Sequence, residues 1–308
     1  MRKLTQNSYK ALLTAGVLLL SGCAQSEGSV EPGEKIIVVT TSSIVEDIVN
    51  NISGGEIVAE SIIPNGFDSH TYEPKPSEIE KLEEADLIIL ADETLNGGIS
   101  QLVKLSGDES RILDLNKAAL STGDFIMRKN AGGWNPHTWT DPTLVMKWVE
   151  PIKTRLQELL PGSREIIERS ASEYLQKLED LDLEIAEAFS NIPKERQKLV
   201  VYHDAWEYFG KKYKIEIVGA LQALDFSEPS AAELEKMAEQ IKNEQVKAFF
   251  GSEVFPSDVL EALERESGAM YIPDLADDKL NGEPGGEGYG YIPLMRANLQ
   301  LLIKGLSL

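Results

Sequence analysis

An unbroken helical segment lies in the middle of this chain, between two stretches in which strand-like and helical segments alternate. The segment runs from Ser163 to Ser190 without a glycine or a proline. At 1.5 Å per residue, a helix of this length spans roughly 40 Å, about the width of a domain. We therefore expect one long helix that connects two lobes. A long surface helix packed on a single domain is the alternative.

The residues before this helix alternate between strand-like and helical patterns. "KIIVVTTS", "EIVAESIIP" and "DLIILA" have the character of buried strands, and "IVEDIVNNI" and "EIEKLEEA" have that of helices. Ser77 and Glu80 have the spacing of a capping box at the start of the second of these helices. A further helix is predicted from Pro142 to Leu160.

The same alternation resumes after the long helix. "KLVVYH", "IEIVGAL", "VKAFFGS" and "AMYIPDL" are predicted strands with helical segments between them, and Asp204 is the predicted N-cap of the first of these helices. Such alternation favours parallel sheets covered by helices. The predicted fold class is therefore α/β, with two lobes that each hold a mostly parallel sheet flanked by helices and that are joined by one long rigid helix.

The N-terminal residues have the pattern of a secretion signal. Arg2, Lys3 and Lys10 precede the apolar run "ALLTAGVLLL", which is shorter than the roughly 20 residues of a membrane span. The following "LSGC" resembles the lipobox of bacterial lipoproteins, which predicts lipidation of Cys23. An ordinary signal peptide with an incidental cysteine is the alternative. We expect a protein of the cell envelope, anchored by lipid to the outer face of the cytoplasmic membrane or located in the periplasm.

These features predict five parts of the chain. They are a lipoprotein signal peptide (1–22), a lipidated tether (23–35), an N-terminal lobe (36–162), the connecting helix (163–191) and a C-terminal lobe (192–308). A chain of 308 residues with 42% hydrophobic content can bury one large core or two medium ones. Its formal net charge of −21 disfavours nucleic acid as a partner, because a phosphate backbone is bound by clustered lysine and arginine.

The chain contains three histidines, and each follows or precedes a predicted element at a junction between a strand and a helix. They are His70, His137 and His203. In open α/β sheets, the junctions at the carboxyl ends of strands are where ligands bind. Because neutral imidazole is a common metal ligand, these positions predict a site for a divalent transition metal.

A fourth ligand is expected to be a carboxylate at another strand end. Asp274 in "YIPDLADD" meets this condition, and Asp277 and Asp278 are competitors for the same role. The residues alone leave the choice among these acids open.

Several motifs resemble one known family. "GFDSHTYEPKPSEI", "NPHTWTDP", "VVYHDAWEYF" and "EPSAAELEKMAEQIKNEQVKAFFGSEVF" are similar to segments of the zinc/manganese solute-binding lipoproteins of bacterial ABC importers, and the resemblance covers nearly the whole mature chain. It implies two α/β lobes joined by a rigid helix, with the metal in the cleft between them. The implied ligands are His70 and His137 from the N-terminal lobe and His203 and Asp274 from the C-terminal lobe.

The resemblance also implies the function. The chain is expected to be a monomeric substrate-binding component that captures a divalent metal and delivers it to a membrane permease with its ATPase. Manganese-dedicated members carry glutamate at the position of His203, and three imidazoles with one carboxylate suit zinc better than manganese. A bidentate Asp274 would leave room for manganese, and no histidine lies between His70 and His137, where many zinc-dedicated members carry a histidine-rich loop. A manganese or broad divalent-metal carrier and a surface adhesin are the alternatives.

An enzyme with a catalytic zinc is a further alternative. Three histidines could hold such an ion, but no H-E-x-x-H motif is present. The acids near the histidine motifs, Glu73, Asp204 and Glu207, are explained equally well as loop or helix-cap residues. We therefore expect a binding protein and no enzyme.

Overall fold

The computed structural model describes residues 36–105, 108–128, 133–222, 229–252 and 258–308. The predicted signal peptide, the lipidation site Cys23 and the tether up to residue 35 lie outside the described residues. Residues 35–308 form one compact unit. Within the described part of the chain, no helix combines the length and the apolar character that a bilayer span requires.

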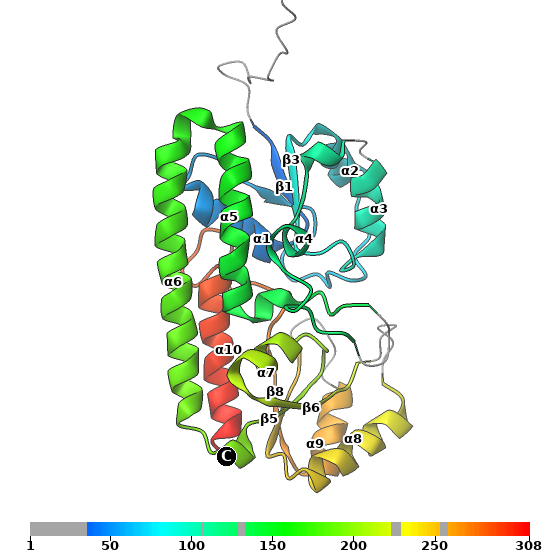
Figure 1. Ribbon diagram of the computed structural model, residues 1–308. Helices are drawn as coiled ribbons and strands as arrows, with labels where there is room; N and C mark the ends of the chain where they lie inside the picture. Colours follow the sequence, from blue (N-terminus) through cyan, green and yellow to red (C-terminus); the bar gives the residue numbers. More distant parts are fainter. Residues whose placement is uncertain (1–35, 106–107, 129–132, 223–228, 253–257) are drawn as a thin grey trace, which may run out of the picture. The chain divides into compact units, whose positions relative to one another are not determined.

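Two four-stranded parallel sheets form the framework of this unit (Figure 1). The first has the order β2-β1-β3-β4, with strands β1 (Val38–Thr40), β2 (Glu60–Ser61), β3 (Leu87–Leu90) and β4 (Ile112–Asp114). The second has the order β6-β5-β7-β8, with strands β5 (Lys198–Val201), β6 (Glu216–Ala220), β7 (Ala248–Phe250) and β8 (Met270–Ile272). In each sheet the strand order reverses next to the first strand, which is the position where open α/β sheets bind ligands.

Ten α-helices are described around these sheets. Those of the first half are α1 (Ser43–Ser53), α2 (Pro76–Glu84), α3 (Gly97–Leu105), α4 (Leu115–Ala119) and α5 (Pro142–Leu159). Those of the second half are α6 (Arg164–Ser190), α7 (Glu207–Tyr213), α8 (Ala231–Asn243), α9 (Asp258–Ser267) and α10 (Tyr291–Leu306). The predicted fold class is confirmed, since two parallel sheets flanked by helices are linked by one long helix.

The long helix α6 packs against elements of both halves. Figure 1 shows it running beside α5 and then beside α10. It also contacts α1 from the first half and α7 from the second. Its buried side chains recur every three or four residues, which places them on one face of the helix: Ile167, Ala171, Tyr174, Leu178, Leu181, Ile185 and Phe189. The helix therefore connects two lobes and is not confined to the surface of one.

One continuous hydrophobic core extends through both lobes. It contains Val38 and Leu87 from the first sheet and Leu199 and Phe250 from the second, together with the buried faces of α5, α6 and α10. Protein interiors are close-packed and resist deformation. The two sheets are thus held to each other by packing along the helices.

Local details differ from the sequence predictions at two helix starts. The helix α2 begins at Pro76, and the backbone N–H of Lys75 donates to Glu78 Oε2 at 2.7 Å, so the predicted box at Ser77 is wrong by two residues. The helix α7 begins at Glu207, so Asp204 does not cap it. Pro76 is favoured at the first position of a helix and places the start of α2 one residue before Ser77, and Trp206, which precedes α7, makes no side-chain cap hydrogen bond.

A pair of leucines on α6 tests the shared core. Leu178 is fully buried, whereas Leu183 on the same helix is 67% exposed. We expect Leu178→Ala to lower the free energy of unfolding by about 2–5 kcal/mol, because it leaves a cavity in the core. Leu183→Ala is the matched control and should change it by no more than about 0.5 kcal/mol. Urea unfolding followed by circular dichroism measures both, and equal effects of the two substitutions would contradict the assigned packing.

Candidate metal centre

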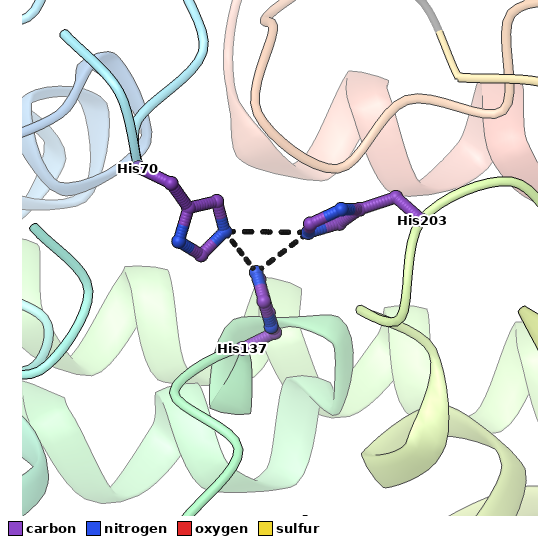
Figure 2. Close-up of side chains that lie close together, drawn as sticks. All are labelled: His70, His137 and His203. Carbon is purple, nitrogen blue, oxygen red and sulfur yellow. Dashed lines mark hydrogen bonds between the residues drawn. The ribbon is translucent and has the colours of Figure 1, made fainter. Parts of the chain in front are cut away.

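The three histidines meet at one point (Figure 2). Nε2 of His137 lies 2.9 Å from Nε2 of His70 and 2.9 Å from Nε2 of His203, and the remaining Nε2 pair is 3.3 Å apart. His70 lies in the loop after β2, His137 precedes the 3₁₀ turn Thr138–Thr140, and His203 follows β5. The structure thus brings together all three histidines that the sequence indicated, with their ligand nitrogens facing one another.

The other ring nitrogens of His70 and His137 are held by oxygen atoms. Nδ1 of His70 lies 3.0 Å from the carbonyl oxygen of Leu95, which can only accept a hydrogen bond. Nδ1 of His137 lies 2.7 Å from Asn135 Oδ1. The same oxygen accepts from the backbone N–H of His137 at 3.0 Å, and Asn135 Nδ2 donates to the carbonyl of Asp204 at 2.8 Å. Both rings therefore carry hydrogen on Nδ1 and direct the lone pair of Nε2 at the centre.

His203 is oriented in the same manner by a side chain. Its Nδ1 lies 2.5 Å from Gln222 Oε1. With hydrogen on Nδ1, the lone pair of its Nε2 joins the other two. Such partners on the far nitrogen fix the orientation of metal-binding histidines.

His70 and His137 are neutral at ordinary pH. Burial, followed by the charge of His203, lowers the pKa of His70 to about 3. Burial also lowers the pKa of His137 well below its usual value. A neutral imidazole can bind a metal ion without first losing a proton.

The carboxylate of Asp277 lies beside this group. Its Oδ2 lies 3.6 Å from His203 Nε2, and the residue is only 3% exposed. Asp278 is also buried, and its Oδ2 accepts hydrogen bonds from the backbone N–H and the hydroxyl of Ser69 at 3.2 and 2.9 Å. Asp274 is exposed and has a φ of 66°, and the structure does not bring it to the histidines. Asp277 thus lies against His203, whereas the predicted Asp274 is exposed.

The spacing of the histidine nitrogens is close to that of a tetrahedral site. Two nitrogens bound to one zinc at about 2.05 Å lie about 3.3 Å apart in tetrahedral geometry. The observed separations of 2.9 to 3.3 Å need only a small outward shift to reach this value. The donor set and its dimensions thus fit a small divalent ion.

Further carboxylates border the histidines on one side. Ligand atoms of Asp68, His70 and Asp278 lie within 4.8 Å of one another. Asp68 Oδ1 also accepts from the backbone N–H of His70 at 2.9 Å, which fixes this turn of the loop. Burial raises the pKa of Asp278 to about 6, and the charge of Asp68 acts in the same direction. This side of the site is rich in oxygen ligands that attract a cation.

Trp139 connects the segments that carry His137 and Asp277. Its ring lies edge-on to the ring of His137 with centroids 5.1 Å apart, and its Nε1 donates to the carbonyl of Asp277 at 2.8 Å. The hydroxyl of Tyr291 donates to the carbonyl of Trp139 at 2.6 Å. A buried tryptophan of this kind packs against the histidine and excludes water.

The loop that carries His70 is also bonded to the segment that carries Asp277. Asn65 donates to the carbonyl of Leu280 at 2.9 Å and accepts from the N–H of Leu280 at 2.8 Å. Together with the contact between Ser69 and Asp278, this pair holds the two lobes against each other beside the site. No pattern in the sequence could have indicated the hydrogen-bond partners of the histidine rings. The same is true of these hydrogen bonds between the lobes.

Comparisons with known proteins agree with this arrangement. The model of a family described as zinc-uptake complex component A, periplasmic, matches residues 38–305. The manganese-binding lipoprotein MntA of Halalkalibacterium halodurans is 30% identical over 294 residues, which cover 94% of this chain and 95% of the relative. The manganese ABC transporter substrate-binding lipoprotein PsaA of Streptococcus anginosus is 28% identical, over 96% of this chain and 97% of the relative.

A solved structure shows the same fold. The periplasmic zinc-binding protein TroA of Treponema pallidum has a TM-score of 0.81 and 25% sequence identity, and the match covers 89% of this chain and 99% of that one. The family match spans both sheets and all three histidines. The chain therefore belongs to the family of zinc-uptake complex component A, the metal-binding solute-binding proteins of ABC importers.

Proposed function

We propose that this protein is the extracytoplasmic substrate-binding component of an ABC importer, which captures zinc and delivers it to a membrane permease and its ATPase. The convergence of three Nε2 atoms on one point carries this proposal. Family members are solute-binding proteins, and the geometry supports binding of an ion without assigning a catalytic base. The ion is the cargo of the protein.

Zinc is the cargo that the donor set favours. Three imidazole nitrogens and one carboxylate form a four-coordinate set of borderline softness, which suits zinc, whereas manganese prefers more oxygen ligands. The relatives are named for both metals, since MntA and PsaA are named for manganese and TroA for zinc. Manganese is the second candidate, and the oxygen atoms of Asp278 and Asp68 beside His70 are the observation that favours it.

Asp277 is the carboxylate that we assign to the ion, in place of Asp274. Its Oδ2 is 3.6 Å from His203 Nε2, and its backbone is held by Trp139. Asp274 is exposed, and its backbone has a left-handed conformation. The first lobe would then supply two histidines and the second lobe one histidine and one aspartate.

The ion would act as a bridge between the lobes. We assign residues 36–162 and 192–308 to the lobes and 163–191 to the helix between them. Lipidated Cys23 would anchor a monomer to the outer face of the cytoplasmic membrane. An ion that contacts both lobes stabilises the closed arrangement only by its higher affinity for it. Because the lobes share one core, capture needs only a small relative shift. A surface adhesin role stays a prediction from the resemblance.

Metal content and titration test the proposed cargo. We expect mass spectrometry of the purified protein to find one zinc ion per chain. After removal of metal with a chelator, calorimetric titration should show tighter binding of zinc than of manganese. Comparable affinities would assign a broader divalent-metal role, and the absence of binding by either ion would refute the metal-carrier proposal.

Single substitutions of the histidines test the ligand set. We expect His70→Ala, His137→Ala and His203→Ala each to weaken zinc binding at least tenfold, because each removes one of four ligands. Calorimetric titration measures the affinity, and thermal unfolding of the metal-free variants serves as a control for folding. A variant that binds zinc as tightly as the wild type would remove that residue from the site.

The choice between the two aspartates is tested by a matched pair. We expect Asp277→Ala to weaken zinc binding at least tenfold, because it removes the buried oxygen ligand. Asp274→Ala, an exposed residue three positions earlier, should leave the affinity unchanged. The reverse result in the same titration would restore Asp274 as the ligand.

A further inference from the structure

The hydroxyl of Tyr208, from the second lobe, is inserted into a backbone pair of the first lobe. Opposed residues of an antiparallel pair can exchange two backbone hydrogen bonds. Ile126 and Asn135 make one of them, since the N–H of Asn135 donates to the carbonyl of Ile126 at 2.9 Å. In place of the other, the Tyr208 hydroxyl accepts from the N–H of Ile126 at 3.2 Å and donates to the carbonyl of Asn135 at 2.7 Å. Burial raises the pKa of Tyr208 to about 12, so the hydroxyl keeps the proton that it donates.

Asn135 is the residue that holds His137. Its Oδ1 lies 2.7 Å from Nδ1 of His137 and accepts from the backbone N–H of the same residue at 3.0 Å. Its Nδ2 donates across the lobes to the carbonyl of Asp204 at 2.8 Å. The second lobe therefore fixes Asn135 at two points, the side-chain amide and the backbone carbonyl that Tyr208 bonds. The ring of His137 takes its position from a residue that is anchored in this way.

The residues that follow His137 are bonded to the second lobe as well. The hydroxyl of Thr140 donates to the carbonyl of Ala205 at 3.1 Å. The indole of Trp139 donates to the carbonyl of Asp277 at 2.8 Å. Although His137 precedes the long helix in the chain, hydrogen bonds on both sides of it lead to the lobe that follows this helix.

His70 is held differently. The atom that orients its ring is the carbonyl oxygen of Leu95, 3.0 Å from Nδ1, and Leu95 belongs to the first lobe. Asn96, also of the first lobe, donates to the carbonyl of Ser69 at 2.9 Å. Ser69 donates in turn to the carboxylate of Asp278, so this loop touches the second lobe through a neighbour of His70. The ring of His70 itself is held by the first lobe.

We infer that Tyr208 is a positioning residue that fixes His137 to the second lobe. This inference rests on the proposed function, and it divides the ligand set in a way that the order of the chain does not. The second lobe holds His137, His203 and Asp277, and the first lobe holds His70. These three form one half-site whose geometry is set within a single hydrogen-bonded unit. The bond of the ion to His70 is then its link to the other lobe.

A pair of tyrosines on α7 tests the role of the hydroxyl. Tyr208→Phe leaves the N–H of Ile126 and the carbonyl of Asn135 without this partner, and we expect it to weaken zinc binding about tenfold. Tyr213→Phe is the matched control, because Tyr213 is also buried but donates to Asp182 of α6 at 2.9 Å, and it should leave the affinity unchanged. Calorimetric titration of the metal-free proteins measures both. Wild-type affinity in Tyr208→Phe would overturn the inference.

Double substitutions separate this role from a merely structural one. If Tyr208 acts through His137, Tyr208→Phe should cause no further loss of zinc affinity in a His137→Ala protein. In a His70→Ala protein it should cause the same loss, about tenfold, as in the wild type. Equal further losses in the two backgrounds would show a general effect on the fold and would contradict the inference.

NMR of the histidine rings tests the same contact without metal. In the metal-free protein we expect Tyr208→Phe to shift the carbon-bound ring proton signals of His137 more than those of His70, and Tyr213→Phe to shift neither. Unchanged signals of His137 in Tyr208→Phe would refute the positioning role.

The outcomes distinguish this inference from the proposed function. Zinc binding by the wild type together with undiminished affinity in Tyr208→Phe refutes the positioning role and leaves the metal carrier intact. Failure of the wild type to bind zinc or manganese refutes the carrier. The ring signals of the metal-free protein decide in that case whether Tyr208 positions His137.

Discussion

The metal centre depends on the core that joins the two sheets. His70 and His203 belong to loops of different sheets, and productive ligand geometry tolerates errors of only about 0.5 Å. Two lobes on a flexible linker could not keep such a tolerance, whereas packing along α5, α6 and α10 can. The long helix therefore positions the binding site, although it contains none of the three histidines. It sets the distance between the two halves of the ligand set.

Hydrogen bonds then define the register of the two lobes at the site. Buried polar groups must be paired, and the cross-links here pair side chains with backbone groups on the opposite lobe. Asn65 bonds both backbone groups of Leu280, and Trp139 bonds the carbonyl of Asp277. A shift of one residue in the segment after β8 would break all of these bonds together. The position of the Asp277 carboxylate therefore depends on these hydrogen bonds between the lobes, and not on the distance in sequence from the end of β8.

The sequence predicted those parts of the structure that show a periodic pattern of apolar residues or that contain a rare residue type. The four strands of the second sheet, the long helix and the meeting of the histidines follow from such patterns, whereas the short strand β4 was not predicted. The carboxylate could not be predicted by counting from β8. The chain turns through a left-handed conformation at Asp274 and buries Leu275 and Ala276, which brings Asp277 to the centre. Asn135 and Gln222 hold the rings of His137 and His203. Their positions in the sequence do not distinguish them from other asparagines and glutamines.

The hydrogen-bond partners of the three imidazole rings bear on how readily the site releases its metal ion. A carboxylate on the far nitrogen of a histidine raises the basicity of the ring and strengthens metal binding. Here the partners are a backbone carbonyl and two side-chain amides, all of them neutral. A site that had to retain its ion would gain from carboxylates at these places. Neutral partners orient the rings while leaving their nitrogens less basic, which suits a protein that must pass its cargo on.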